Sequence, residues 1–338
     1  MPDEAALEEL LSRPTPPVVQ AMADLEGDLM IVGAGGKMGP TLARLALRAS
    51  QAAGVRRRVI AVARLPDSAV RASLVRDGMD IVECDLFDRD QVARLPEVPN
   101  VVYMVGQKFG TAEDQPRTWA VNAYLPAVAA ERFQDARIVA FSSGNVYPLS
   151  PQGGGGPSET DPVGPIGEYA QSVLARERVL EFFSRRNGTP MTILRLNYAI
   201  EPRYGVLRDI ADRVRGRRTV DVTMGWVNLI WQRDANAIAL RALAHCAVPP
   251  AVLNLTGRPA LSVRCLAQQF GRRWGIEPEF SRVEAPTALL SNAARCEALF
   301  GTPEVGIEEM IEQVADWVER DGRSLGMPTH FEEREGSF

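Results

Sequence analysis

The chain has 338 residues, of which 46% are apolar and 24% are charged, and its formal net charge is −5. A chain of this length and composition buries a large core, and its acidic balance excludes a broad basic surface for nucleic acid. A local basic cluster, three arginines at 56–58, precedes an apolar run and is interpreted as a solvated loop. We therefore expect no nucleic-acid partner.

Cysteines, histidines and the start of the chain limit the function further. The cysteines and histidines are Cys84, Cys246, Cys265, Cys296, His245 and His330. Their spacing does not match that of metal ligands, so no metal site is expected. The acidic start lacks a basic segment followed by an apolar run, and no apolar stretch is long enough to span a bilayer. We expect a reduced, cytoplasmic protein with no signal peptide and no membrane partner.

Residues 4–26 read as one or two short helices broken by prolines, and they form an N-terminal helical extension over 1–27. From residue 28 onward, apolar β-type runs alternate with amphipathic helical patterns. The runs are 29–32, 59–63, 81–84, 101–105, 138–141 and 191–194. Continuous apolar strands separated by helices are typical of a parallel sheet covered on both faces. The sequence therefore predicts an α/β fold, with a Rossmann-type doubly wound parallel sheet over 28–200.

After about residue 200 the pattern loosens, and short strands such as 252–255 mix with helices. We interpret 201–322 as a smaller, mixed substrate-binding region, some of whose elements return to the main sheet. The tail, 323–338, carries several charges and little periodicity. Such a segment is expected to be poorly ordered.

The first apolar run leads into Gly33, Gly36 and Gly39, and a helical pattern follows. Glycine lets the backbone turn sharply and approach a pyrophosphate without a Cβ in the way. The helix N-terminus then offers amides and a positive dipole end to the anion. The alternative is an ordinary strand-to-helix turn, but three glycines directly after the first strand favour a dinucleotide-binding loop that includes Lys37 and Met38.

The Gly-x-x-Gly-x-x-Gly spacing and several later segments resemble the extended short-chain dehydrogenase/reductase superfamily, in particular the NAD(P)-dependent epimerases and dehydratases. These segments are Asp85-Leu86, Asn122 in a Val-Asn step, the Ser-Ser-x-x-Val-Tyr segment 142–147, the helix start at 234–238 and residues 292–317. Each match alone is unspecific, but their order and spacing extend over about 28–320. The resemblance implies a Rossmann fold, a dinucleotide cofactor, a small-molecule substrate and a homodimer.

The resemblance also implies which residues contact the cofactor. Besides the glycine loop they are Arg64, Asp85, Leu86, Val105, Gly106, Gln107, Asn122, Tyr169 and Leu196. An acidic residue at the end of the second strand would hold the adenosine ribose and select NAD, but this strand ends in Arg64. Arginine pairs with the 2′-phosphate of NADP, although a solvated arginine is common at a strand end. We favour NADP over NAD.

In this family a tyrosine exchanges a proton with the substrate hydroxyl during hydride transfer, and a serine orients that oxygen. A lysine four residues after the tyrosine holds the nicotinamide ribose and lowers the tyrosine pKa. Matched position by position, Ser143 and Tyr169 take the serine and tyrosine roles, but Val173 stands where the lysine is expected. An unperturbed tyrosine ionises near pH ~10, so it is a poor base at neutral pH.

Three explanations for Val173 are open. Another cation substitutes for the lysine: Lys108, at the cofactor edge, is the preferred candidate, and Arg176, on the same helix face but about two turns beyond Tyr169, is the less favoured one. Alternatively, Tyr169 acts as an acid or hydrogen-bond donor, which needs no lowered pKa. Finally, the protein binds a dinucleotide without turnover. We rank altered or rescued catalysis above loss of activity.

The substrate side also departs from the family pattern. We expect Asn145, Asn197 and Tyr198 to contact the substrate, although Tyr198 stands where the family has asparagine. Glu201 replaces a glycine, and Val227 stands where an arginine would pair with a diphosphate, which argues against a nucleotide diphosphate-sugar. We predict an oxidoreductase or epimerase that acts on a hydroxyl or keto group of a sugar-like molecule. The alternative is a non-catalytic NAD(P)-binding sensor or assembly subunit.

Overall fold

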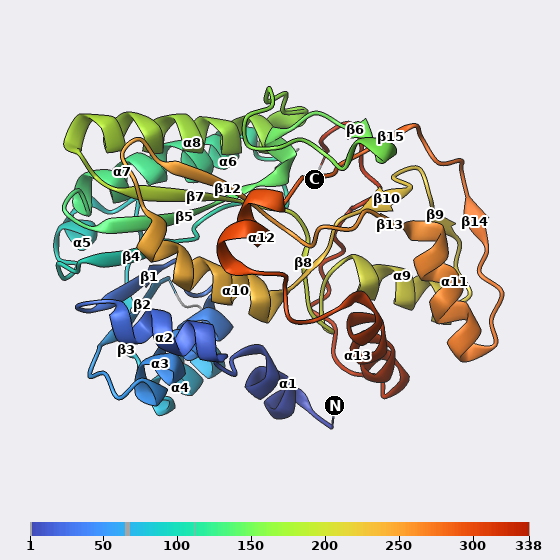
Figure 1. Ribbon diagram of the computed structural model, residues 1–338, viewed down its shortest axis with the longest axis horizontal. Helices are drawn as coiled ribbons and strands as arrows, with labels where there is room; N and C mark the ends of the chain where they lie inside the picture. Colours follow the sequence, from blue (N-terminus) through green and yellow to red (C-terminus); the bar gives the residue numbers. More distant parts are fainter. Residues whose placement is uncertain (1, 65–67, 112, 338) are drawn as a thin grey trace.

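A seven-stranded parallel sheet forms the centre of the larger part of the molecule (Figure 1). The computed structural model describes residues 2–64, 68–111 and 113–337. The strands, in spatial order, are β12 (Ala251–Leu255), β7 (Met191–Leu196), β5 (Arg137–Ser143), β4 (Asn100–Tyr103), β1 (Leu29–Val32), β2 (Val59–Ala63) and β3 (Asp80–Glu83). This arrangement confirms the expected Rossmann-type sheet, and run 252–255 returns to it as an edge strand beside β7.

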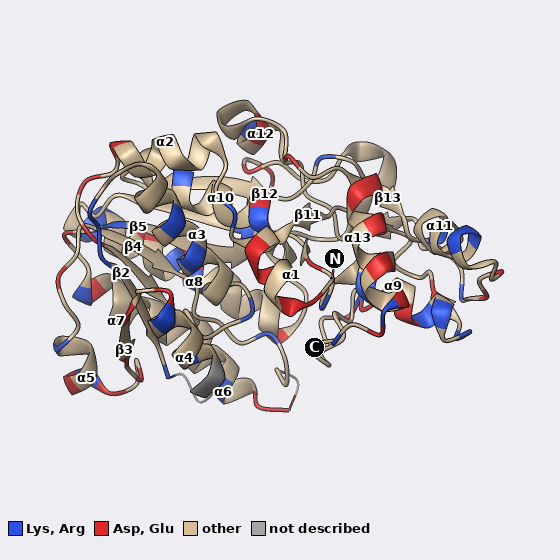
Figure 2. Cartoon of the chain, turned by 90° about the horizontal axis from the view of Figure 1, so that it is seen from below, with Lys and Arg blue, Asp and Glu red and all other residues tan. Residues whose placement is uncertain are grey.

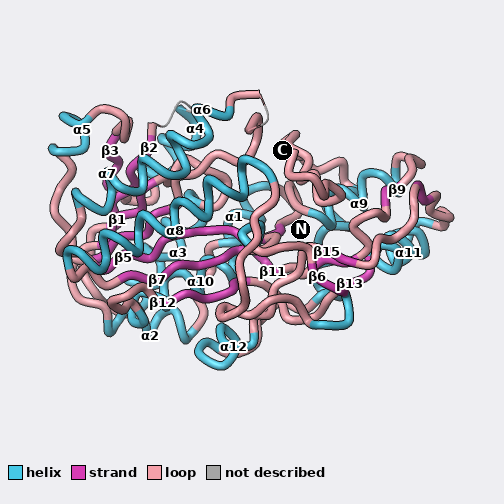
Figure 3. Tube along the Cα trace, turned by 90° about the horizontal axis from the view of Figure 1, so that it is seen from above, coloured by secondary structure: helices cyan, strands magenta, loops and turns pink. Residues whose placement is uncertain are grey.

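Helices cover both faces of the sheet, because side chains of successive strand residues point to opposite faces. Leu29 and Ile31 of β1 belong to the core beneath α2, α3 and α10, whereas Met30 and Val32 belong to the core beneath α7 and α8. The covering helices are α2 (Pro16–Asp24), α3 (Gly39–Ala52), α4 (Ser68–Arg76), α5 (Arg89–Ala93), α6 (Gln115–Trp119), α7 (Leu125–Arg132), α8 (Gly167–Asn187) and α10 (Gln232–Arg241). Seen from above, α7 and α8 run over the strands (Figure 3).

The smaller region lies at the carboxyl ends of the strands and has its own apolar core. Its helices are α9 (Val206–Arg215), α11 (Val263–Trp274), α12 (Ala294–Phe300) and α13 (Ile307–Glu319). Short strands pair β6 (Ser150–Pro151) with β15 (Thr287–Ala288), β8 (Ala199–Ile200) with β11 (Ile230–Trp231), β9 (Val220–Asp221) with β14 (Phe280–Ser281) and β10 (Trp226–Val227) with β13 (Leu261–Ser262). The mixed character expected for this region is therefore present.

The N-terminal residues form two helices that join the two cores. Helix α1 (Glu4–Leu11) buries Leu7 and Leu11 in the core of the smaller region, and α2 buries Val18 and Met22 against the sheet helices. Acidic residues of α1 and α13 and basic residues of α3 are visible from below (Figure 2). No helix in the described ranges is long and apolar enough to cross a membrane.

The C-terminal tail is ordered by burial, so the expectation that it would be poorly ordered is wrong for residues 323–337. Phe331 is 2% exposed and Thr329 is 1% exposed. The Thr329 amide and hydroxyl both donate to Asp209 Oδ2, at 2.8 and 2.5 Å, and Arg334 Nη1 donates to the Thr287 carbonyl at 2.6 Å. Single buried anchors of this kind leave no periodic pattern in the sequence, which explains why the tail resembled a disordered segment.

Candidate dinucleotide and substrate site

Two neighbouring cavities lie at the carboxyl ends of the central strands. From β1 the chain proceeds outward to β2 and β3, and it then returns to place β4 on the other side of β1. Ligands of open α/β sheets bind where the strand order reverses in this way. The β2-side cavity has a volume of about 390 Å³ and the β5-side cavity about 290 Å³. Gly33, Gly36, Gly106 and Gln107 line both, so the two cavities meet along the glycine loop.

The glycine loop has the geometry that a close ligand approach requires. Gly33 has φ +96°, and a Cβ there would lie 2.8 Å from the Val105 nitrogen. Gly39 is packed under the loop, where a Cβ would meet the Ala34 carbonyl oxygen at 2.3 Å. Gly36 lines both cavities, and a Cβ there would touch the Gly33 carbonyl oxygen at 3.5 Å, an ordinary van der Waals contact. A side chain at 36 would therefore occupy space that a ligand needs.

The β2-side cavity brings together the residues expected at the adenosine end. It is lined by Arg64, Asp85, Leu86 and Val105, together with the Gly106–Gln107 edge. Asn122 stands behind that edge: its Oδ1 accepts from the Gln107 amide and its Nδ2 donates to the Gln107 carbonyl, both at 2.9 Å. Asn122 and Gly39 line neither cavity, so their contribution is to hold the loops that do.

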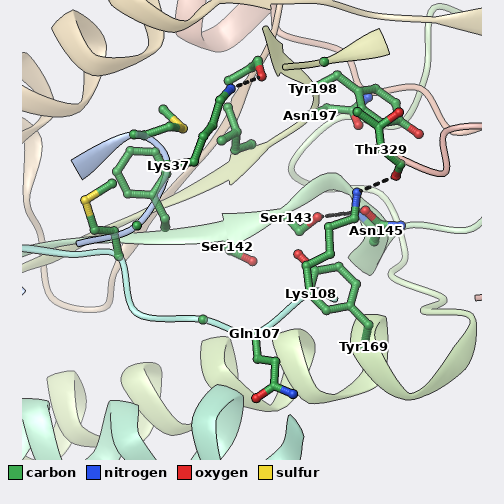
Figure 4. Close-up of a pocket in the computed structure, with 18 of the residues that line it drawn as sticks. Lys37, Gln107, Lys108, Ser142, Ser143, Asn145, Tyr169, Asn197, Tyr198 and Thr329 are labelled. Carbon is green, nitrogen blue, oxygen red and sulfur yellow. Dashed lines mark hydrogen bonds between the residues drawn. The ribbon is translucent and has the colours of Figure 1, made fainter. Parts of the chain in front are cut away.

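Ser143, Asn145 and Tyr169 meet in the β5-side cavity (Figure 4). Ser143, at the end of β5, donates from Oγ to Asn145 Oδ1 at 2.9 Å and accepts from the Asn145 amide at 3.2 Å. Tyr169, in the first turn of α8, shares a hydrogen bond with Ser143. Burial raises the Tyr169 pKa above its ordinary value, and the Ser143 hydrogen bond and the Arg176 charge offset only part of that rise. Tyr169 is therefore protonated at neutral pH.

Val173 is 1% exposed and packs in an apolar cluster with Val146 and Tyr147. It does not line the β5-side cavity. Residue 173 therefore contributes to the packing of α8 against the 3₁₀ turn after β5, and it offers the cavity no polar group.

Two lysines reach the β5-side cavity from different segments. Lys108 Nζ donates to the Thr329 carbonyl at 3.1 Å, and burial lowers the Lys108 pKa to about 8 although Asp209 and Glu332 favour its charged form. Figure 4 shows its side chain extending toward Ser143, Asn145 and Thr329. Lys37 Nζ donates to the Ala199 carbonyl at 2.9 Å and lies 4.4 Å from the Tyr204 ring centroid. Burial lowers the Lys37 pKa to about 7, despite the opposing charge of Glu201.

Arg176, the candidate cation that the sequence favoured less, also lines the β5-side cavity. The side chain is 5% exposed, and its guanidinium donates to the Phe141 carbonyl and to Asn122 Oδ1, each at 2.7 Å. The spacing in the sequence overestimates the distance from the Arg176 guanidinium to Tyr169, because long helical side chains lean toward the N-terminus of their helix, here toward Tyr169.

The expected substrate residues Asn197 and Tyr198 line the cavity, as does Leu196. Tyr198 has φ +46°, a left-handed conformation that asparagine adopts more readily than tyrosine. Glu201 is 1% exposed and pairs with Arg203 at 3.1 Å, so its carboxylate serves an internal ion pair. Val227 is fully buried in β10 and offers no cation there.

Several lining residues were not anticipated. They are Met104, Phe141, Ser142, Arg176, Ala199, Ile200, Tyr204, Gly205 and Thr329. Thr329 lies in the C-terminal tail and Tyr204 lies in the loop before α9. Neither segment contains a motif that would mark these residues as part of the site. Within the residues that the structure describes, no group of three or more His, Cys, Asp or Glu is arranged to hold a metal ion.

A model of the NAD-dependent epimerase/dehydratase family matches residues 29–254. This match covers more than half of the chain, including the glycine loop, Ser143 and Tyr169. The chain belongs to the NAD-dependent epimerase/dehydratase family. The resemblance to the NAD(P)-dependent epimerases and dehydratases is thereby confirmed. No curated protein sequence matches the chain.

Several solved structures share the fold. A UDP-glucuronic acid 4-epimerase from Bacillus cereus in complex with NAD has a TM-score of 0.72 at 15% identity, and the match covers 87% of this chain and 99% of that chain. A UDP-glucose 4-epimerase from Thermotoga maritima gives 0.70 at 18%, over 87% and 99%. An Agrobacterium tumefaciens short-chain dehydrogenase/reductase superfamily protein with bound NAD gives 0.71 at 18%, over 87% and 98%. At these identities the likeness shows the fold alone.

Proposed function

We propose that the protein is an NAD(P)-dependent oxidoreductase or epimerase that acts on a hydroxyl or keto group of a sugar-like molecule. The observation that carries this proposal is the hydrogen-bonded pair of Ser143 and Tyr169, placed in a cavity that adjoins the glycine loop. A buried phenol and a hydroxyl that share one hydrogen bond suit the binding of a single substrate oxygen between them.

The residues present fit a dinucleotide. Gly33 and Gly36 keep the loop free of side chains, the adenosine end would lie against Asp85 and Leu86, and the cofactor would cross the Gly106–Gln107 edge into the β5-side cavity. Bound there, the cofactor would supply hydride transfer. We favour NADP over NAD, because Arg64 rather than a carboxylate lines the cavity at the end of β2.

In the proposed reaction Tyr169 acts as an acid toward a keto group. Its raised pKa keeps the phenol protonated at neutral pH, so a proton is available for the substrate oxygen. Lys108, which extends into the same cavity, is the proposed cation at the substrate end, where its ammonium would stabilise negative charge on that oxygen.

The proposed substrate is not a typical nucleotide diphosphate-sugar. The absence of a cation at Val227, which is fully buried in β10 and pairs with Leu261 of β13, supports this view. The Thr329 segment, which lines the cavity, also limits the space beside Lys108. A compact hydroxy or keto compound suits this cavity of about 290 Å³ better than an extended one.

The experiment that tests the proposal combines binding and turnover. NADP(H) and NAD(H) binding is measured by calorimetry, and a panel of carbohydrates and related hydroxy and keto compounds is screened for nicotinamide absorbance changes. For any substrate found, we expect Tyr169→Phe to lower kcat by about 10²–10⁴-fold with little change in cofactor affinity. Full activity of that variant would refute the site assignment, and unchanged turnover of Lys108→Ala would exclude the role given to Lys108.

The rival function is a dinucleotide-binding sensor or assembly subunit without turnover. Val173 favours it, because an apolar residue there cannot supply a charge. Tight cofactor binding with no turnover of any compound in the panel would support this rival.

A further inference from the structure

We propose that Arg176 takes over the work of the missing lysine: its guanidinium provides the fixed positive charge beside Tyr169 and donates hydrogen bonds to the cofactor ribose. The proposal rests on the function proposed above. It assigns to a residue three positions beyond Val173 a role that residue 173 cannot perform.

The reach of the side chain is the first argument. Seven residues separate Tyr169 from Arg176, a helix rise of roughly 10 Å. The arginine stem leans back toward the N-terminus of α8, and the guanidinium ends between the Asn122 segment, Phe141 of β5 and the Gly106 edge. A Cβ on residue 106 would lie 2.8 Å from Arg176 Nη2, so the glycine at 106 leaves the space that the guanidinium occupies.

The second argument is that this buried charge has no acidic partner among the residues that the structure describes. The neighbouring carboxylate, Glu177, pairs with Arg195 at 2.7 Å, and no ion pair in the described ranges includes Arg176. Three guanidinium N–H groups donate to protein oxygens, which leaves two of the five for other acceptors. Because Arg176 lines the cavity, ribose hydroxyls of a bound cofactor are suitable acceptors.

The third argument concerns the charges that face Tyr169. The groups that line the same cavity are Arg176 from α8, Lys37 from the glycine loop, Lys108 from the segment after β4, and Tyr198 and Tyr204 from the segments after β7. Burial raises the pKa of both of these tyrosines, so they are neutral near pH 7. Burial raises the pKa of Tyr169 and that of the buried Tyr103 of β4, and the Arg176 charge opposes the rise in both.

These features define what Arg176 would do during the reaction. Tyr169 would give its phenolic proton to the substrate oxygen as a bound reduced cofactor would supply hydride to the carbonyl carbon, and a phenolate would remain. The guanidinium charge stabilises this phenolate, and in the reverse direction it favours removal of the hydroxyl proton. Arginine stays charged at every accessible pH, so this stabilisation does not titrate away.

The test compares Arg176→Gln and Arg176→Lys with a matched control. Arg178→Gln removes a charge from an exposed position of α8, where the side chain is 59% exposed. Three quantities are measured for each variant: the affinity for oxidised cofactor, the pH dependence of kcat, and the titration of Tyr169 in cofactor-free protein. The titration uses the ring-carbon NMR signals of labelled tyrosine, assigned with the Tyr169→Phe variant. Thermal melting verifies that each variant is folded.

We expect Arg176→Gln to weaken cofactor binding by about 10–100-fold, as loss of hydrogen bonds to a charged donor predicts. We also expect it to move the Tyr169 titration, and the pH dependence of kcat, to higher pH. Arg176→Lys should recover part of both effects, and Arg178→Gln should show neither. A merely structural arginine would lower the melting temperature without moving the titration, and that result would overturn the proposal.

The failure of this proposal is distinguishable from failure of the proposed function. Absence of cofactor binding or turnover in the unmodified protein would contradict the function. The Tyr169 titration of the cofactor-free variants would still decide whether Arg176 acts on that phenol. Conversely, an active enzyme whose Arg176→Gln variant retains cofactor affinity and an unchanged pH profile would refute the role of Arg176 alone.

Discussion

At the scale of single residues, the β5-side cavity is defined by its charge. Lys37, Lys108 and Arg176 line it, and none of its lining residues is Asp or Glu. Burial disfavours the charged form of a cation, which is why the pKa values of the two lysines are lowered although Glu201, near Lys37, and Asp209 and Glu332, near Lys108, oppose the shift. The charge imbalance suits an anionic ligand, and a dinucleotide pyrophosphate is one.

Lys37 gives a prediction about stability and pH. Its pKa is about 7 in the folded protein and 10.5 when unperturbed, so between these values the unfolded chain binds the proton more tightly. By linkage, stability falls as the pH drops from about 10.5 to about 7, and the penalty is complete below that window. Lys37→Met removes this penalty. The melting temperature of Lys37→Met minus that of the unmodified protein should therefore be higher at about pH 7 than at about pH 10. A pH-independent difference, measured by calorimetry, would contradict this assignment.

The site residues that could be predicted from the sequence are those that belong to motifs defined by residue type and spacing. Gly33, Ser143 and Tyr169 belong to motifs of fixed spacing, and the structure brings Ser143 and Tyr169 together. Arg176 could not be predicted, because its contribution depends on the direction of a long side chain rather than on sequence distance. Thr329 comes from an aperiodic tail that pattern reading treats as disordered.

At the scale of elements, one carboxylate of helix α1 forms ion pairs with arginines from both parts of the molecule. Glu8 pairs with Arg44 of α3 and, at 2.7 Å, with Arg203 of the loop before α9. Both arginines are 8% exposed, and Arg203 also holds the buried Glu201. The neighbouring residue, Tyr204, lines the cavity. The N-terminal helix therefore supports the loop that closes one side of the site.

We expect Glu8→Gln to lower the free energy of unfolding by about 1–3 kcal/mol, because it leaves two largely buried guanidinium groups less satisfied. The matched control is Glu9→Gln, since Glu9 is 48% exposed and pairs with Arg48 on the surface. That change should stay within about 0.5 kcal/mol. Urea unfolding measures the free energy of unfolding of both variants. Equal decreases in the two would show that the Glu8 ion pairs stabilise the protein no more than the surface pair of Glu9.

The tail gives a second prediction at this scale. Phe331 is 2% exposed in the core of the smaller region, two residues after Thr329. Phe331→Ala should cost about 3–5 kcal/mol of unfolding free energy, as for other buried aromatic truncations. Met327→Ala, at a side chain that is 41% exposed, serves as the control and should change little. If both variants unfold at the same urea concentration as the parent protein, the tail does not stabilise the site.

At the scale of the whole molecule, the central sheet could be predicted because buried parallel strands read as continuous apolar runs. The position of β12 was harder to foresee. Its five residues pair with β7, which lies more than fifty residues earlier in the chain, and nothing local in the sequence selects that neighbour. The short paired strands of the smaller region depend equally on long-range contacts. Strand type is thus encoded locally, whereas strand partners are not.

The outer surface of α6, α8 and the π-helical turn Ala120–Tyr124 bears on the homodimer that the family resemblance implies. Large apolar side chains are exposed on it: Phe182 is 56% exposed, Tyr124 50% and Trp119 37%. These segments pack against one another, so the three side chains lie on adjoining elements. Exposed apolar side chains on adjoining elements mark interaction surfaces, and a two-fold dimer would bury such a surface against its own copy.

This arrangement predicts that Phe182→Glu dissociates the dimer. An unpaired carboxylate at a buried interface costs several kcal/mol, so dimerisation should weaken by at least about 100-fold. Val283→Glu is the matched control, because Val283 is 77% exposed and lies outside these elements. Sedimentation equilibrium should give a dimer for the parent protein and for Val283→Glu but a monomer for Phe182→Glu. A monomeric parent protein, or a Phe182→Glu variant that still dimerises, would exclude this face as the interface.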